Sequence, residues 1–130
     1  MESSSNMPPD NGPPGNPELP AVNKKAALAL VDGDEELFME IAQVFLEDAR
    51  AYVEKLRGAL DANNAEEVEH YAHTLKGAAA NICATAFKDT ASDIESAARN
   101  KDLNLAVKFH ARFESEFQRL IGYLSEIGIS

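Results

Sequence analysis

Three residues near the middle of the chain combine a nucleophile, a cation and an uncovered surface: His73, Lys76 and Gly77. Residues three and four apart are neighbours on a helix surface, so Lys76 and Gly77 would both flank the ring of His73. A neutral imidazole nitrogen can attack phosphorus, and an ammonium group can offset the charge of phosphoryl oxygens. Glycine inside a helix costs about 1 kcal/mol relative to alanine, but here it leaves room for a partner to approach the ring. The three residues therefore favour a covalently held phosphoryl group on His73.

The segment that carries these residues has an apolar stripe at helical spacing. On a helical wheel the stripe fills a sector about 100° wide. Its members are Val68, Tyr71, Ala72, Leu75, Ala79 and Ile82. His73 lies about 150° from the centre of the stripe, and Gly77 lies almost opposite it. We therefore expect the stripe to face the core and His73 to face solvent.

The helix surface around His73 is also the predicted docking surface for a partner, because a transient interface is an apolar patch ringed by polar residues. The predicted partner-binding residues within about two turns are Glu69, His70, Ala80 and Asn81. An exposed apolar residue of the preceding helix, Phe38 or Met39, is expected to complete the patch.

Other groups with chemical potential are expected to be structural. His70 and His73 form a His-x-x-His pair with acidic neighbours, but bundle metal sites face inward and both rings are expected to face out, so no metal site is predicted. Cys83 has no base near it in sequence and is expected at the core or a helix end. His110 is expected at the surface.

Helical periodicity continues along the chain from Val22 onward, and no strand pattern is visible. A short helix is predicted over Lys24–Val31, followed by four long helices. Asp34 is predicted to cap the second helix and Asn64 the third, which should reach about Ala84, and Thr85 is predicted to cap the fourth. Short polar connections imply antiparallel neighbours. The predicted fold class is all-α, an up-down-up-down antiparallel four-helix bundle with a short extra N-terminal helix.

Composition excludes several classes of partner. The 130 residues include 12 Lys and Arg against 22 Asp and Glu, a formal net charge of -10. This balance argues against nucleic acid and against an anionic membrane surface. No apolar run is long enough to insert into a membrane, no signal peptide is visible, and the single cysteine favours a reducing compartment. We therefore expect a cytoplasmic protein, with a monomer as the default.

The N-terminal segment differs from the rest of the chain. All six prolines lie at or before Pro20, among Gly, Asn and Ser residues. Such a composition cannot bury a core, so residues 1–22 are predicted to be either a Pro-rich flexible linker or an arbitrary leader. Residues 23–130 are predicted to form the single domain.

The sequence Ala72–Ile82 strongly resembles the His-x-x-Lys-Gly signature of histidine-containing phosphotransfer (HPt) domains of multistep phosphorelays. The resemblance covers about residues 24–127. Three further segments are similar to that family, namely Asp32–Leu37, Phe45–Asp48 and Ile94–Arg99. On an amphipathic helix at this place in a four-helix chain, the signature is specific.

The resemblance implies a phosphorelay intermediate of two-component signal transduction. His73 would accept a phosphoryl group from a receiver-domain aspartate and pass it to another receiver domain, with Lys76 and Gly77 in support. The implied partners are response-regulator receiver domains and a hybrid sensor kinase. Many members of the family lie at the C-terminus of such a kinase, after a flexible linker. No cofactor of its own is implied, and Mg²⁺ is expected on the partner receiver. The alternative is a receiver-docking module without phosphotransfer.

The chain is expected to be a phosphocarrier and not an ATP-dependent kinase, since it has no Gly-rich nucleotide loop. It departs from the family at two positions. Cys83 stands where many members have glycine, and Glu95 stands where some have glutamine. Two interpretations of Glu95 stay open: a carboxylate that holds Lys76 or the far ring nitrogen of His73, and a solvated residue, which is preferred.

Overall fold

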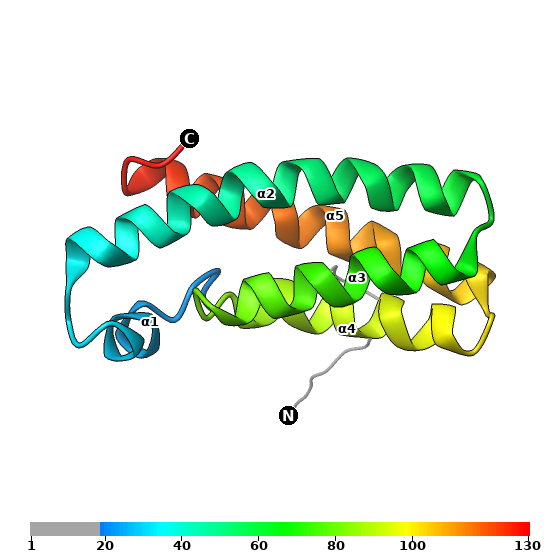
Figure 1. Cartoon of the computed structure of the whole chain (residues 1–130), viewed down its shortest axis with the longest axis horizontal. Helices are drawn as coiled ribbons and strands as arrows, with labels where there is room; N and C mark the ends of the chain where they lie inside the picture. The colour runs from blue at the N-terminus through cyan, green and yellow to red at the C-terminus, as the bar shows by residue number, and fades with distance from the viewer. Residues whose placement is uncertain (1–18) are drawn as a thin grey trace, which may run out of the picture.

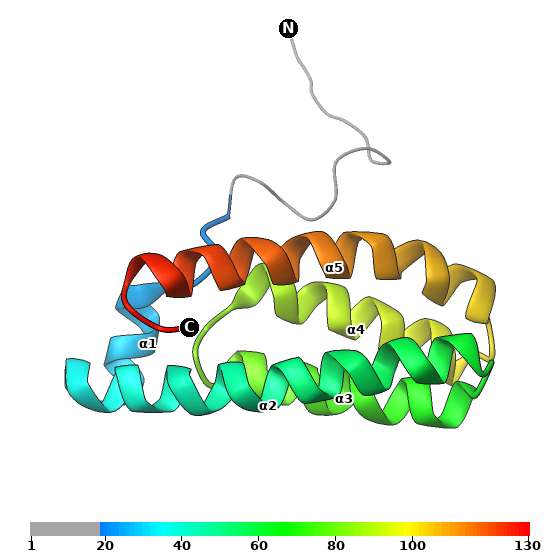
Figure 2. The ribbon, with the colours of Figure 1, turned by 90° about the horizontal axis from the view of Figure 1, so that it is seen from above.

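The computed structural model describes residues 19–130, which form five helices and no strand (Figure 1). The helices are α1 (Lys24–Leu30), α2 (Glu35–Asp61), α3 (Ala65–Ala80), α4 (Thr85–Arg99) and α5 (Leu103–Glu126). The four long helices lie side by side along the long axis of the molecule, and α1 lies at the end where α2 begins (Figures 1 and 2). The predicted all-α class is confirmed.

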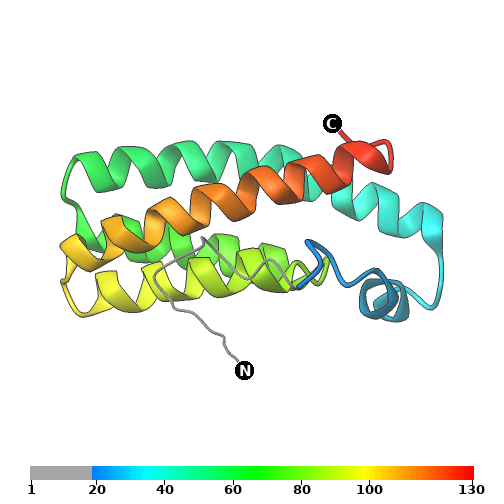
Figure 3. The same ribbon diagram turned by 180° about the vertical axis from the view of Figure 1, so that it is seen from behind.

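Consecutive long helices run in opposite directions because only three or four residues connect them. Helix α3 packs between α2 and α4, α4 packs against α5, and α5 also contacts α2, which closes the bundle (Figure 3). The predicted up-down-up-down topology with a short extra N-terminal helix is therefore confirmed. None of the helices in residues 19–130 is long and apolar enough to cross a membrane.

The core consists of the apolar stripes of the helices. On α3 the predicted stripe is buried at Val68, Ala72, Leu75 and Ala79, and Tyr71 is partly buried at its edge. Because this stripe faces inward over the whole helix, the opposite face of α3 must point to solvent. The fold thus fixes the side of the bundle on which the functional residues lie.

The predicted caps of α2 and α3 are present. The side chain of Asp34 accepts a hydrogen bond from the backbone N–H of Leu37 at 3.0 Å, and that of Asn64 accepts one from Glu67 at 3.1 Å. These bonds satisfy backbone donors that the first turn of a helix leaves without a partner. Local polar chemistry therefore sets the start of the helix that carries His73.

The end of that helix was predicted wrongly. Helix α3 stops at Ala80, and not at Ala84, because Cys83 adopts a left-handed backbone conformation with φ of 55°. The cap of α4 is Ala84, which has no side-chain acceptor, whereas Thr85 is already inside the helix. Ile82 and Ala84 are fully buried, so core packing rather than a polar cap determines this turn.

The N-terminal boundary of the packed region lies earlier than residue 23. Of the predicted 1–22 segment, residues 1–18 lie outside the described residues. Ala21 and Val22 are buried in the core, at 8% and 3% exposure. The backbone N–H of Asn23 donates to the carbonyl of Cys83 at 3.0 Å, which ties this segment to the turn after α3. The packed unit therefore includes at least Ala21 onward.

Candidate functional site

His73 projects from the solvent face of α3, as the helical wheel predicted. Its side chain is 66% exposed, whereas Ala72 and Leu75 on the opposite face are buried. The ring is not free to rotate, because its Nδ1 atom lies 2.8 Å from Oε2 of Glu95 on α4. One nitrogen of the imidazole is thus engaged, and Nε2 remains available toward solvent.

Glu95 is buried, so the preferred interpretation of a solvated residue is wrong. Its side chain is 4% exposed and receives three donors. Besides His73, Lys76 Nζ lies 2.6 Å from Oε1 of Glu95, and Arg99 Nη2 lies 2.7 Å from Oε2. The carboxylate therefore holds both Lys76 and the ring nitrogen of His73, which is the other interpretation considered above.

The charge of Glu95 decides how the ring is protonated. Burial alone would raise the pKa of this carboxyl, but hydrogen bonds from Lys76 and His73 outweigh burial and lower the pKa below its usual range. The group is therefore ionised at neutral pH and acts only as an acceptor. A neutral His73 must then carry its proton on Nδ1, which leaves the lone pair of Nε2 free to act as a nucleophile.

Arg99 is a site residue that the sequence analysis did not identify. It bridges the two helices, since its Nε donates to Glu69 Oε2 at 3.0 Å while its Nη2 donates to Glu95. The spacing of Glu95 and Arg99, four residues apart on one helix, was the available signal for this pair. Two cations, Lys76 and Arg99, thus stand beside an exposed histidine.

Gly77 leaves an open surface next to the ring. A Cβ atom built at this glycine meets no atom within 4 Å, so no packing constraint inside the described chain requires glycine there. Ala80 and Asn81, farther along α3, are exposed as well. The surface beyond His73 therefore has no bulky side chain at Gly77, and a large partner could approach it.

The remaining predicted neighbours line the other side of His73. Glu69, His70, Glu95 and Arg99 border a shallow hollow of about 440 Å³ that also contains His73. The His70 ring lies 5.3 Å from that of Tyr71. Among residues 19–130 no three His, Cys, Asp or Glu side chains are grouped as a metal site requires.

Two expectations about more distant residues need correction. Phe38 is 2% exposed and belongs to the core, and Met39 is only partly exposed, so neither forms an open apolar surface. The exposed large apolar residues of α2 are instead Leu37 and Val44. His110 is not a surface residue either, since its side chain is 20% exposed and its Nε2 lies 3.0 Å from Glu114.

Comparisons with known proteins agree with this geometry. The family model described as Hpt domain matches residues 40–123, which span most of α2 and all of α3 and α4. The crystal structure of histidine-containing phosphotransfer protein B from Pseudomonas aeruginosa PAO1 is similar, with a TM-score of 0.76 and 23% sequence identity. That match covers 82% of this chain and 93% of the other, and it bears on the fold alone. The comparison with curated proteins gives no significant match.

Proposed function

The chain belongs to the Hpt domain family, and on that premise we propose that His73 carries a phosphoryl group between the aspartates of two receiver domains. Hpt domains are phosphocarriers and not kinases. The observation that supports His73 as the carrier is the hydrogen bond from its Nδ1 to the buried, ionised Glu95, which leaves Nε2 as the exposed nucleophile.

The transfer step balances without any further reactant. The lone pair of His73 Nε2 attacks the phosphorus of the receiver's aspartyl phosphate, a bond from nitrogen to phosphorus forms, and the bond from phosphorus to the aspartate oxygen breaks. The aspartate leaves as a carboxylate with the electron pair. The proton on Nδ1 stays in place, so the ring gains positive charge. The reverse attack by a second receiver's carboxylate returns His73 to its neutral form.

Glu95 has two roles in this proposal. It holds the Nδ1 proton, which selects the productive tautomer, and its negative charge stabilises the ring cation that forms as the phosphoryl group arrives. The hydrogen bond from Lys76 helps to keep the carboxylate ionised within the bundle, and Arg99 donates a further hydrogen bond to it. Lys76 is 33% exposed and close to the ring, so its ammonium group can also reach the phosphoryl oxygens.

We assign Mg²⁺ to the partner receiver, where it would neutralise the charge of the transferred group. The open surface at Gly77, Ala80 and Asn81 would admit the receiver, with Glu69 and His70 at its edge. We further propose that the carrier is a monomer, because the apolar stripes of its long helices cover one another. The cytoplasmic location expected from the sequence is part of the same proposal.

The proposal is tested with a receiver domain that has been phosphorylated with acetyl phosphate. The intact chain should gain the mass of one phosphoryl group, and the modification should be labile in acid and stable in base, as expected for a phosphoramidate. The His73→Gln variant should fold normally and gain no mass. If it accepts the group as the wild type does, the proposed function is wrong. A chain that binds receivers and never gains mass would instead be the docking-only module.

A further inference from the structure

Arg99 links two carboxylates that differ greatly in exposure. Its Nη2 donates to Oε2 of Glu95, whose side chain is 4% exposed, and its Nε donates to Oε2 of Glu69, whose side chain is 36% exposed. Removing a cation from a buried carboxylate leaves an unpaired buried charge, whereas an exposed ion pair contributes little to stability. The bond to Glu69 is therefore the one that Arg99 can exchange at small cost.

The guanidinium of Arg99 stands next to the ring of His73. Nη2 of Arg99 and Nδ1 of His73 both lie within hydrogen-bond distance of one atom, Oε2 of Glu95. The side chain of Arg99 is 57% exposed, and it lines the hollow of about 440 Å³ that also contains His73. Open space beside the ring is thus available for the guanidinium to turn into.

Phosphorylation of His73 would change which partner Arg99 prefers. A protein-bound phosphoryl group carries up to about two negative charges and has three acceptor oxygens. Glu69 carries one charge and stands four residues before His73 on α3, so it would repel the group rather than bind it. Arginine pairs well with phosphoryl oxygens as well as with carboxylates. The more highly charged group therefore competes with Glu69 for the guanidinium.

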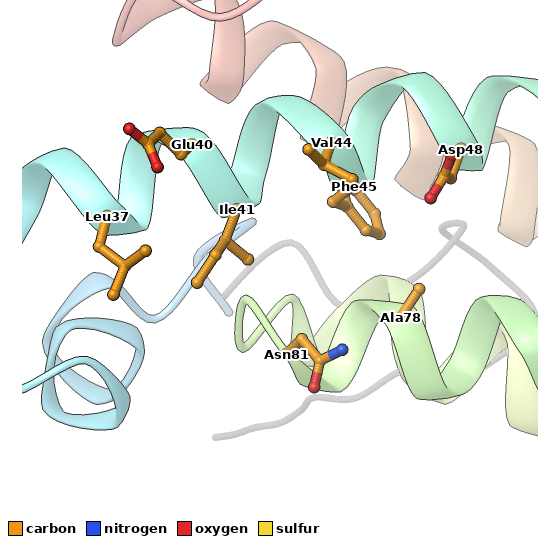
Figure 4. A pocket seen from close by; sticks show the side chains of 8 residues that line it. All are labelled: Leu37, Glu40, Ile41, Val44, Phe45, Asp48, Ala78 and Asn81. Carbon is orange, nitrogen blue, oxygen red and sulfur yellow. The ribbon is translucent and has the colours of Figure 1, made fainter.

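The apolar groove between α2 and α3 offers no such exchange (Figure 4). It has a volume of about 360 Å³, and the charged residues that line it are Glu40 and Asp48. A phosphoryl group would meet only negative charge there. Of these two depressions, the hollow at His73 is the one that combines a cation with a counter-ion that can be displaced.

We propose that Glu69 is the counter-ion of a mobile Arg99. It holds the guanidinium while His73 is free, and phosphorylation of His73 moves the guanidinium from Glu69 to the phosphoryl oxygens. Arg99 keeps its bond to Glu95 and turns about it. Glu69 is thus a positioning residue, because it acts only through Arg99. The inference rests on the proposed function of His73 and adds a residue that sets how strongly the carrier retains the phosphoryl group.

The first test measures the equilibrium of phosphoryl exchange between the full chain and one purified receiver domain, phosphorylated with acetyl phosphate and then freed of that donor. The equilibrium constant depends only on the free proteins, so contacts made during docking cancel. Glu69→Gln is compared with a matched control, Glu66→Gln. Glu66 lines the same hollow, and within residues 19–130 it makes no ion pair, so this control removes the same charge without freeing Arg99.

The equilibrium constant in favour of phosphorylated His73 should rise about threefold in Glu69→Gln and fall about fivefold in Arg99→Met. Glu66→Gln should remain close to the wild type, since exposed charges are screened by solvent. In an Arg99→Met background, Glu69→Gln should have no larger effect than Glu66→Gln, because the guanidinium through which Glu69 acts is gone.

The second test observes Arg99 directly, by NMR of the arginine Nε–H groups. The signal of Arg99 is identified by its loss in Arg99→Met, and phosphoramidate serves as a small donor that phosphorylates His73 without a receiver. The signal should shift on phosphorylation, as the bond to Glu69 is exchanged. The signal of Arg57, whose Nε donates to Glu114, should stay in place.

Two results would overturn the exchange and leave His73 as the carrier. One is an Arg99 signal that does not move when His73 is phosphorylated. The other is an equal equilibrium constant for Glu69→Gln and Glu66→Gln. Phosphoryl transfer from the receiver to the His73→Gln variant would instead overturn the proposed function itself.

Discussion

Residues 19–130 contain two histidine–glutamate pairs, and they differ in which member is covered. In the pair of His73 and Glu95, the histidine is 66% exposed and the carboxylate is 4% exposed. In the pair of His110 and Glu114, the values are 20% and 25%, so the ring itself is largely covered. Each carboxylate also holds a cationic side chain. Residue types alone therefore do not distinguish the proposed nucleophile from a structural histidine.

The residue one turn farther along each helix explains much of the difference. Four residues after His73 stands Gly77, whereas four residues after His110 stands Glu114 itself. Arg57 of α2 donates to both oxygens of Glu114 at 2.6 Å, so that carboxylate links α2 to α5, while His110 stacks on Phe113. In the first pair, the exposed ring of His73 is held by the buried carboxylate of Glu95. In the second pair, the carboxylate of Glu114 links α2 to α5.

The largest effect on phosphoryl transfer should come from replacing Glu95, and the same replacement at Glu114 provides the comparison. Glu95→Leu deletes the acceptor for Nδ1, and we expect receiver-to-His73 transfer to fall by about 10- to 100-fold, by analogy with the loss of the hydrogen-bond partner of a metal-bound histidine. Glu95→Gln keeps a side-chain acceptor for the Nδ1 proton but loses the negative charge, so its transfer rate should lie between those of Glu95→Leu and the wild type. Glu114→Leu should leave the transfer rate unchanged and lower the free energy of unfolding by about 1–2 kcal/mol.

Rapid-quench transfer assays and urea unfolding of the same samples would separate these effects. An equal loss of transfer in Glu95→Leu and Glu114→Leu would show that the two pairs do not differ in function. A Glu95→Gln variant as slow as Glu95→Leu would show that the negative charge of Glu95, and not its acceptor oxygen, supports transfer.

A smaller effect on transfer is expected when Gly77 is replaced by glutamate, the residue type that stands four positions after His110. Gly77→Glu would place a carboxylate beside His73, and we expect transfer from a receiver to fall several-fold through repulsion of the phosphoryl group and obstruction of the partner. Gly77→Ala and the matched control Gly58→Ala should each stabilise the protein by about 1 kcal/mol, since neither added Cβ meets an atom within 4 Å. Only the change at Gly77 should slow transfer. An unaltered rate in both Gly77 variants would remove this glycine from the site.

The smallest expected effect is the contribution of His110 to the pH dependence of stability. Burial lowers the pKa of His110 below its usual value of 6.5, so the unfolded chain binds a proton more readily than the folded chain. The stability that neutral His110 contributes is therefore complete above pH 6.5 and is lost as the pH falls toward the lower folded pKa. Chemical unfolding between pH 7.5 and about 5.5 should show a decline that His110→Gln reduces. Identical pH profiles for the two proteins would contradict this.

Much of the fold was predictable because local rules agreed with the tertiary structure. The apolar stripe of α3 placed His73 on the outside, and Asp34 and Asn64 were identified as caps from residue type and position. The position of Lys76 and Gly77 beside His73 followed from helical spacing alone. These features depend on contacts within a single helix, which one sequence displays directly.

The errors occurred where packing between helices decides the outcome. Ala84 caps α4 without a polar side chain because it is buried, and Cys83 takes a left-handed conformation usually left to glycine. Glu95 is buried where α3 packs against α4, and three donors from these two helices offset the cost of its burial. Its position four residues after Ala91, in the apolar stripe of α4, was a usable signal. The spacing of residues along one helix does not show that side chains from two helices meet at Glu95.

The backbone hydrogen bond from Asn23 to Cys83 limits how far the domain can be shortened from its N-terminal side. The family match begins at residue 40, inside α2, yet the turn that ends the site helix is closed from the other side by Ala21, Val22 and Asn23. A recombinant fragment that started at residue 40 would lack this hydrogen bond to the turn after α3, together with the buried Ala21 and Val22. The shortest fragment that preserves this end of the site helix therefore starts no later than Ala21.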